Sequence, residues 1–219
     1  MKTKAILFDL DDTLSDSKKY IRICHTVNAN KYIIGIKDDK QKKAIIDDLV
    51  WLSTKKEIKK LKDRIKYIED KYSVKITQPI FYRYFWNRYM KKYFCLYDDA
   101  ADTLKKLKER RYKIGLVSNS GYQVQYTKLE LTDIKKYFDC FSISEEIKLY
   151  KPDKEVFFDS LNKLGIKPNE AVYVGDNYEK DIKGAMNASI KPIWYKGNKN
   201  NNEGITCIDT LSELLEMFK

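Results

Sequence analysis

The chain has 219 residues, of which 43% are hydrophobic and 34% are charged, and its formal net charge is +11. This composition can supply a buried core and excludes a wholly disordered chain. The single histidine, His25, argues against a His-rich metal site and against a Ser-His-Asp hydrolase. The four cysteines form no C-x-x-C pair, and no apolar run approaches the length of a membrane span. We therefore expect a cytoplasmic protein without a zinc ribbon or a transmembrane helix.

The excess positive charge is confined to one internal segment. Residues 16–97 hold 21 Lys and Arg against 9 Asp and Glu, whereas the rest of the chain holds 22 against 23. The same segment contains 14 of the 29 aromatic residues. Such a change in composition predicts that residues 16–97 form a domain inserted into a near-neutral domain of residues 1–15 and 98–219.

The chain begins with an apolar run, residues 4–9, that predicts a short buried strand ending in a carboxylate. Helical periodicity then dominates the insert, where three apolar stripes predict three helices. Their residues are Ile45, Leu49 and Leu52; Ile58, Leu61, Ile65 and Ile68; and, after Pro79, Phe81, Phe85, Tyr89 and Tyr93. We therefore expect an all-helical insert.

From residue 98 onward the pattern alternates between helix and strand. Apolar runs predict strands over residues 113–118, 140–144, 171–175, 191–195 and 205–208. Amphipathic segments between them predict helices, including those over residues 122–131 and 178–186 and one that Gly165 ends. This alternation favours an α/β fold, a Rossmann-like parallel sheet with helices on both faces.

Carboxylates follow two of the expected strands. Asp9 and Asp11 come at the end of the first, and Asp176 follows the strand over residues 171–175. In an open α/β sheet these positions lie at the edge where ligands bind. Carboxylates crowded at one place repel one another unless a cation neutralises them. We therefore predict a site of hard oxygen ligands suited to Mg²⁺ and a substrate phosphate.

Other polar residues are expected at the same edge. Ser118 and Asn119 end the strand over residues 113–118, and Lys151 lies in the loop after the next strand. A hydroxyl and an ammonium group are donors that suit the oxygens of a phosphoryl group. Their presence beside the carboxylates indicates phosphoryl chemistry.

Four motifs in this order resemble those of the haloacid dehalogenase-like superfamily of aspartate-nucleophile phosphatases. The first, D-x-D-x-T, matches Asp9 to Thr13, and the second matches Ser118. The third matches Lys151 in K-P-D, and the fourth, G-D-x-x-x-x-D, matches Gly175 to Asp181. The insert lies between the first and second motifs, where this family places a helical cap of the type called C1.

The resemblance implies a role for each carboxylate. Asp9 would attack phosphorus and form an aspartyl-phosphate, and Asp11 would act as general acid and then as general base. A Mg²⁺ ion would be held by the side chains of Asp9 and Asp176 and by the backbone carbonyl of Asp11.

It also implies roles for the other matching residues. Ser118, Asn119 and Lys151 would hold the transferring phosphoryl group and stabilise its charge. Asp181 would orient the metal ligands rather than bind the ion, with a surface ion pair as the alternative. Thr13 would order the loop after the nucleophile.

The expected activity is hydrolysis of small phosphorylated metabolites by a monomer or a homodimer. Asp11 favours phosphate esters over carbon–halogen bonds, because a halide needs no proton to leave. A 2-haloacid dehalogenase and a phosphomutase remain alternatives on the same fold. The basic, tyrosine-rich insert raises a different alternative, binding of nucleic acid, although the helical spacing of its aromatics favours a buried role.

Overall fold

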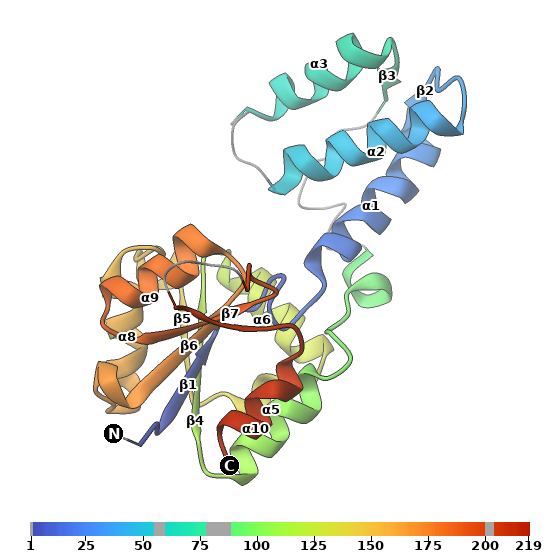
Figure 1. Cartoon of the computed structure of the whole chain (residues 1–219). Coiled ribbons are helices and arrows are strands. Elements are labelled where there is room, and N and C mark those ends of the chain that lie inside the picture. Colours follow the sequence, from blue (N-terminus) through green and yellow to red (C-terminus); the bar gives the residue numbers. More distant parts are fainter. Residues whose placement is uncertain (1, 55–59, 78–88, 200–203) are drawn as a thin grey trace. The chain divides into compact units, whose positions relative to one another are not determined.

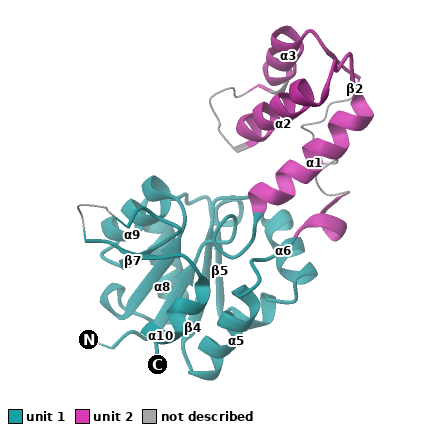
Figure 2. Cartoon of the chain, turned by 45° about the vertical axis from the view of Figure 1, so that its right-hand side comes forward, with its two compact units in different colours: residues 1–16, 95–219 teal, residues 17–94 magenta. Residues whose placement is uncertain are grey.

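The computed structural model describes residues 2–54, 60–77, 89–199 and 204–219. These residues form two compact units, coloured separately in Figure 2. The core unit comprises residues 1–16 and 95–219, and the insert unit comprises residues 17–94. Within the described ranges, no helix combines the length and the apolar character that crossing a membrane requires.

The core unit contains a six-stranded, fully parallel sheet with the strand order β5-β4-β1-β6-β7-β8 (Figure 1). This architecture confirms the predicted α/β fold. The strands are β1 (Ala5–Phe8), β4 (Lys113–Ser118), β5 (Cys140–Ile143), β6 (Ala171–Gly175), β7 (Lys191–Tyr195) and β8 (Thr206–Ile208).

The sheet is buried on both faces, as the uninterrupted apolar runs of its central strands require. Side chains alternate along β1, so Ile6 and Phe8 join one apolar cluster whereas Ala5 and Leu7 join the other. The first cluster is covered by α5, α6 and α10, and the second by α8 and α9. The α-helices of the core unit are α5 (Ala100–Glu109), α6 (Tyr122–Leu131), α7 (Ser144–Ile147), α8 (Lys154–Leu164), α9 (Lys183–Asn187) and α10 (Leu214–Met217).

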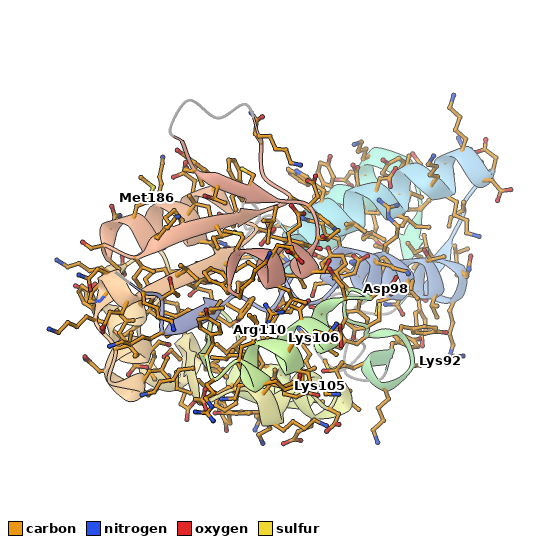
Figure 3. The ribbon with its side chains drawn as sticks, turned by 60° about the horizontal axis from the view of Figure 1, so that its bottom comes forward. Lys92, Asp98, Lys105, Lys106, Arg110 and Met186 are labelled. Carbon is orange, nitrogen blue, oxygen red and sulfur yellow. The ribbon has the colours of Figure 1, made fainter. Side chains whose placement is uncertain are left out.

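Short helical turns complete the core unit. They are η1 (Lys135–Tyr137), η2 (Pro168–Glu170), the π-helical turn η3 (Tyr178–Ile182) and η4 (Leu211–Glu213). The C-terminal α10 is held against α5 by Arg110, whose Nη1 donates to the carbonyl oxygens of Leu215 and Phe218 at 2.5 and 2.8 Å. Figure 3 shows Arg110 near Lys105 and Lys106 on α5.

The insert unit is built around helices, and one of them buries the first predicted stripe. Its elements are α1 (Ser17–Tyr32), β2 (Ile33–Ile34), α2 (Asp39–Thr54), α3 (Leu61–Tyr72) and β3 (Lys75–Ile76). Ile45, Leu49 and Leu52 of α2 pack in one cluster with Ile68 of α3. Residues 89–93 are helical, but most of the third predicted helix lies outside the described residues, as do Ile58, Pro79, Phe81 and Phe85.

The prediction of an all-helical insert is wrong, because β2 and β3 pair as a short antiparallel ribbon. Ile33 and Ile34 directly follow α1, and they are β-branched residues that favour extended backbone. Gly35 follows with a φ of +92°, a conformation that suits glycine and turns the chain away from the helix. The carbonyl oxygen of Tyr32, at the end of α1, then accepts from the backbone N–H of Thr77, which follows β3, at 2.9 Å.

The histidine of α1 is buried in the insert unit. Nε2 of His25 lies 2.7 Å from Oγ of Ser53, whose own hydroxyl donates to the carbonyl oxygen of Leu49 at 2.9 Å. The hydroxyl has one hydrogen, so Nε2 must carry the proton and donate to Ser53. Burial lowers the pKa of His25 to about 3, so this ring stays neutral in the folded protein.

We expect His25 to make the protein less stable as the pH falls from about 6.5 toward 3. In this window the unfolded chain takes up a proton on the imidazole, whose ordinary pKa is about 6.5, and the folded chain does not. Between pH 7 and pH 5 this effect lowers the free energy of unfolding by about 2 kcal/mol. Urea unfolding at both pH values measures the free energy of unfolding that is lost between pH 7 and pH 5. This loss should be about 2 kcal/mol smaller in His25→Gln than in the wild type. Equal losses in the two proteins would contradict this account.

Candidate active site

The polar residues predicted at the strand ends meet at the carboxyl edge of the sheet. β1 lies between β4 and β6, with Phe8 beside Leu116 on one side and beside Val174 on the other. The next residue, Asp9, is buried, and its backbone N–H donates to the carbonyl oxygen of Val174 at 3.0 Å. Ser118, the last residue of β4, is buried as well.

A tight loop follows β1 and keeps the D-x-D pair at this edge. The carbonyl oxygen of Leu10 accepts from the backbone N–H of Leu14 at 2.9 Å, and from the N–H and Oγ of Ser15 at 3.0 and 3.1 Å. Asp12 has a φ of +64°, which aspartate tolerates better than most residues. The chain therefore turns back at once instead of continuing the strand.

Lys151 is the centre of a buried ionic network. Its Nζ donates to Oδ1 of Asp9 at 2.6 Å, to Oδ1 of Asp181 at 2.7 Å and to the hydroxyl of Tyr173 at 2.9 Å. These three bonds use all the hydrogens of an ammonium group. Burial lowers the pKa of Lys151, but the carboxylates of Asp181 and Asp9 outweigh burial, so the net pKa is raised and the side chain stays charged.

Tyr173 connects the members of this network from the middle of β6. Its hydroxyl accepts from Lys151 and donates to Oδ1 of Asp181 at 2.9 Å. Burial raises the pKa of the Tyr173 phenol well above its usual value, and the neighbouring carboxylates raise it further. The tyrosine therefore remains a neutral donor that helps to fix Asp181.

Asp181 reaches the network because Gly175 has no side chain. A Cβ at Gly175 would lie 2.5 Å from Cβ and 2.6 Å from Cγ of Asp181, closer than two atoms can pack. Oδ2 of Asp181 accepts from the backbone N–H of Asn177 at 3.0 Å. The glycine of the G-D-x-x-x-x-D motif thus permits the close approach, and the loop after β6 holds the second oxygen.

Three carboxylates form a group that could hold a metal ion. One oxygen from each of Asp9, Asp176 and Asp181 lies within 4.8 Å of the others. Burial raises the pKa of Asp9 well above its usual value; Lys151 opposes this, and the other carboxylates add to it. Three carboxylates around one ammonium group leave an excess of negative charge. The residues present therefore fit a divalent cation with oxygen ligands such as Mg²⁺.

The second aspartate of the D-x-D pair faces α6. Its Oδ1 accepts from Nζ of Lys128 at 2.5 Å, and its Oδ2 accepts from Nε2 of Gln125 at 2.9 Å. The same Nε2 lies 2.7 Å from Oγ of Ser118. Asp11 is thus held by two donors from one helix, and one of them also reaches the end of β4.

The other two predicted residues, Asn119 and Thr13, differ in their contacts. Asn119 braces the backbone of Lys151, because its Nδ2 donates to the Lys151 carbonyl and its Oδ1 accepts from the Lys151 N–H, both at 2.8 Å. Thr13 is buried, and within the described part of the chain its Oγ1 has no hydrogen-bond partner.

The structure therefore brings most of the predicted residues into one site and adds three that the sequence analysis missed. Asp181 is buried in the network and is not part of a surface pair. Tyr173, Gln125 and Lys128 were not predicted. Their positions along α6 could have indicated Gln125 and Lys128. Both share the buried face of this helix with Leu129, where apolar residues are expected.

A cluster of carboxylates around a buried lysine, at the carboxyl edge of a doubly covered parallel sheet, is the arrangement of an α/β enzyme site. The haloacid dehalogenase-like hydrolase family matches residues 6–195, so the chain belongs to this family.

Relatives and solved structures agree with this assignment. The chain is 32% identical to a glyceraldehyde 3-phosphate phosphatase of Methanopyrus kandleri over 90% of this chain and 85% of the relative. It is 31% identical to the protein of the same name in Methanocaldococcus jannaschii over 99% of this chain and 97% of the relative. The fold is similar to that of the HAD-hydrolase YfnB from Bacillus subtilis, crystallised with magnesium, with a TM-score of 0.76, 20% identity and full coverage of both chains.

Proposed function

We propose that this protein is a Mg²⁺-dependent phosphatase that hydrolyses phosphate monoesters of small metabolites through an aspartyl-phosphate on Asp9. The observation that carries the proposal is the pairing of a buried Asp9 carboxylate with Lys151 in a cluster of further carboxylates. The names of the archaeal relatives, which are phosphatases of a three-carbon sugar phosphate, support this substrate class.

In the first step an oxygen of Asp9 attacks phosphorus and the bond from phosphorus to the leaving oxygen breaks. Asp11 takes up a proton before this step and gives it to that oxygen, so the alcohol leaves neutral. In the second step Asp11 takes a proton from water, the water oxygen attacks the phosphorus of the aspartyl-phosphate, and the Asp9–phosphorus bond breaks. Inorganic phosphate is released and both carboxyl groups return to their starting state.

The remaining residues hold charge and geometry. Lys151 balances charge on Asp9, and Ser118 donates its hydroxyl hydrogen to a phosphoryl oxygen. The Ser118 oxygen already accepts from Gln125, which leaves that hydrogen for another acceptor. Asp9 and Asp176 would hold a Mg²⁺ ion together with the Asp11 carbonyl, and the ion would supply neutralising charge to the phosphate. Asp181 positions Lys151 beside them.

We also propose the domain organisation that composition indicates. Residues 1–15 and 98–219 form the catalytic core, and residues 16–97 form a C1-type cap whose basic charge attracts small anionic substrates. Nucleic acid is not the expected partner, because the helical spacing of the aromatic residues favours a buried role for them. A small phosphorylated partner and a cytoplasmic location follow from the same proposal.

The Asp11 carboxyl favours hydrolysis of phosphate esters over dehalogenation, because only the ester leaving group needs a proton. A phosphomutase uses the same two aspartates and differs in transferring the phosphoryl group to a second sugar rather than to water. Release of inorganic phosphate therefore separates the two.

The test is phosphate release from 4-nitrophenyl phosphate and from glyceraldehyde 3-phosphate, with added Mg²⁺ and with EDTA. We expect turnover that Mg²⁺ raises by at least about 100-fold over EDTA. Turnover that EDTA leaves unchanged would exclude the metal. No release from either ester, together with chloride release from a 2-haloacid or isomerisation of a sugar phosphate, would replace the proposal with one of its alternatives.

A further inference from the structure

One face of α6 touches two different groups of the site. Gln125 and Lys128 lie three residues apart, which places them on the same side of the helix. Both are buried, although glutamine and lysine are normally exposed. Burying these groups is costly unless they are fully bonded, so their position calls for a function.

The amide of Gln125 joins the two groups. Its Nε2 lies 2.9 Å from Oδ2 of Asp11 and 2.7 Å from Oγ of Ser118, and an amide nitrogen has two hydrogens, one for each acceptor. Within the described residues its Oε1 is buried with no hydrogen-bond partner. The opposite orientation would set Oε1 against the Asp11 carboxylate, which repels it. The amide therefore keeps this orientation at the cost of one unbonded oxygen.

Lys128 fixes the other oxygen of the same carboxylate. Its Nζ lies 2.5 Å from Oδ1 of Asp11, and only 9% of the lysine side chain is exposed, against 33% for the aspartate. A lysine that served the surface alone would extend into solvent. With both oxygens bonded to α6, the plane of the Asp11 carboxyl group is set by the helix.

We infer that Gln125 and Lys128 are positioning residues that orient the acid–base carboxylate of Asp11, and that Gln125 also orients the phosphate-binding hydroxyl of Ser118. This inference rests on the proposed function. The proton passes only between Asp11 and the leaving or attacking oxygen, so α6 neither gives nor takes one. Its contribution is to hold the donor and the phosphate ligand in one fixed geometry, which strongly affects rates of proton transfer.

A comparison of two esters with different leaving groups tests the role of Lys128. Departure of 4-nitrophenolate needs little help from an acid, whereas an alkoxide needs a proton. We expect Lys128→Met to lower kcat/KM by about 30-fold on glyceraldehyde 3-phosphate. On 4-nitrophenyl phosphate the loss of kcat/KM should stay below about 3-fold, because kcat/KM reports only the steps up to departure of the leaving group. Hydrolysis of the aspartyl-phosphate, in which Asp11 is the base, enters kcat on both esters alike. Lys128→Arg, which keeps the charge, should recover most of the lost kcat/KM.

Gln125→Leu should behave differently, because it removes contacts to two groups. We expect kcat on the alkyl ester to fall by about 10-fold and KM to rise by about 10-fold on both esters. Gln123→Leu is the matched control, since Gln123 is exposed on the same helix. It should leave both parameters unchanged.

The possible outcomes separate the inference from the proposed function. If the wild type hydrolyses neither ester, the proposed function fails and this inference with it. If the wild type is active but Lys128→Met lowers kcat/KM equally on both esters, or on neither, the positioning role is wrong and the proposed function stands. Melting temperatures of the variants near that of the wild type ensure that kinetics, not folding, are compared.

Discussion

Asp9→Asn is expected to reduce phosphate release by at least about 10⁴-fold, the scale of loss when a covalent nucleophile is removed. The amide cannot form the acyl phosphate that divides the reaction into two steps. Its carbonyl oxygen can still accept the hydrogen bond that Lys151 now gives to Oδ1, so the fold should persist. The measurement is steady-state phosphate release with saturating Mg²⁺.

A second readout addresses the covalent intermediate directly. Wild-type protein quenched in acid during turnover of a ³²P-labelled ester should retain label that hydroxylamine removes, as an acyl phosphate requires, and Asp9→Asn should retain none. Asp102→Asn, an exposed aspartate of α5 paired with Lys106, is the matched control and should keep full activity. Activity of Asp9→Asn within ten-fold of the wild type would assign the nucleophile to another residue.

The sheet was predictable because its strands are short apolar runs followed by polar residues. The run before Asp9, the run ending at Ser118 and the run ending at Gly175 each correspond to a strand of the structure. In a parallel sheet the ends of such strands share one edge, so strand order was not needed to bring these residues together. Local pattern therefore predicted the strand-end residues of the candidate site, whereas Asp181 and Thr13 were predicted from the motif resemblance.

The residues that the sequence analysis missed depend on tertiary packing. Tyr173 has the β-propensity and apolar body of a core residue, and nothing local shows that its hydroxyl meets Lys151. Gln125 and Lys128 belong to a helix whose exposed side is also polar, so their burial is set by what α6 covers. Such contacts join residues more than a hundred positions apart, as Lys128 and Asp11 do.

In the insert unit, the prediction of an all-helical domain failed at the residues that follow α1. Ile33 and Ile34 lie in none of the three predicted apolar stripes, and they pair with β3. Short apolar runs are ambiguous between helix and strand, and the pairing partner decides. Here that partner lies about forty residues further along the chain.

Lys151→Met is expected to remove activity and to destabilise the protein at once. The Lys151 side chain is 3% exposed and pairs with Asp9 at 2.6 Å and Asp181 at 2.7 Å, whose side chains are 9% and 2% exposed. Methionine fills similar space but leaves two buried carboxylates without their cation. Breaking a buried ion pair in this way costs about 3–5 kcal/mol. Chemical unfolding in EDTA measures this loss.

If uncompensated negative charge destabilises Lys151→Met, two changes should restore part of its stability: a second substitution and added Mg²⁺. The double variant Lys151→Met/Asp181→Asn removes one carboxylate, so its free energy of unfolding should exceed that of Lys151→Met. Mg²⁺ should raise the melting temperature of Lys151→Met more than that of the wild type, because the cation replaces the missing positive charge. Neither change should restore catalysis, since the ammonium group beside Asp9 is still absent.

Lys183→Met is the matched control for these measurements. Lys183 pairs with Glu179 across one helical turn at 2.9 Å, with both side chains largely exposed, so its loss should leave stability and activity unchanged. If Lys151→Met were as stable as Lys183→Met in EDTA, the buried carboxylates would not depend on the ammonium group for stability, and the role of Lys151 would be confined to the reaction.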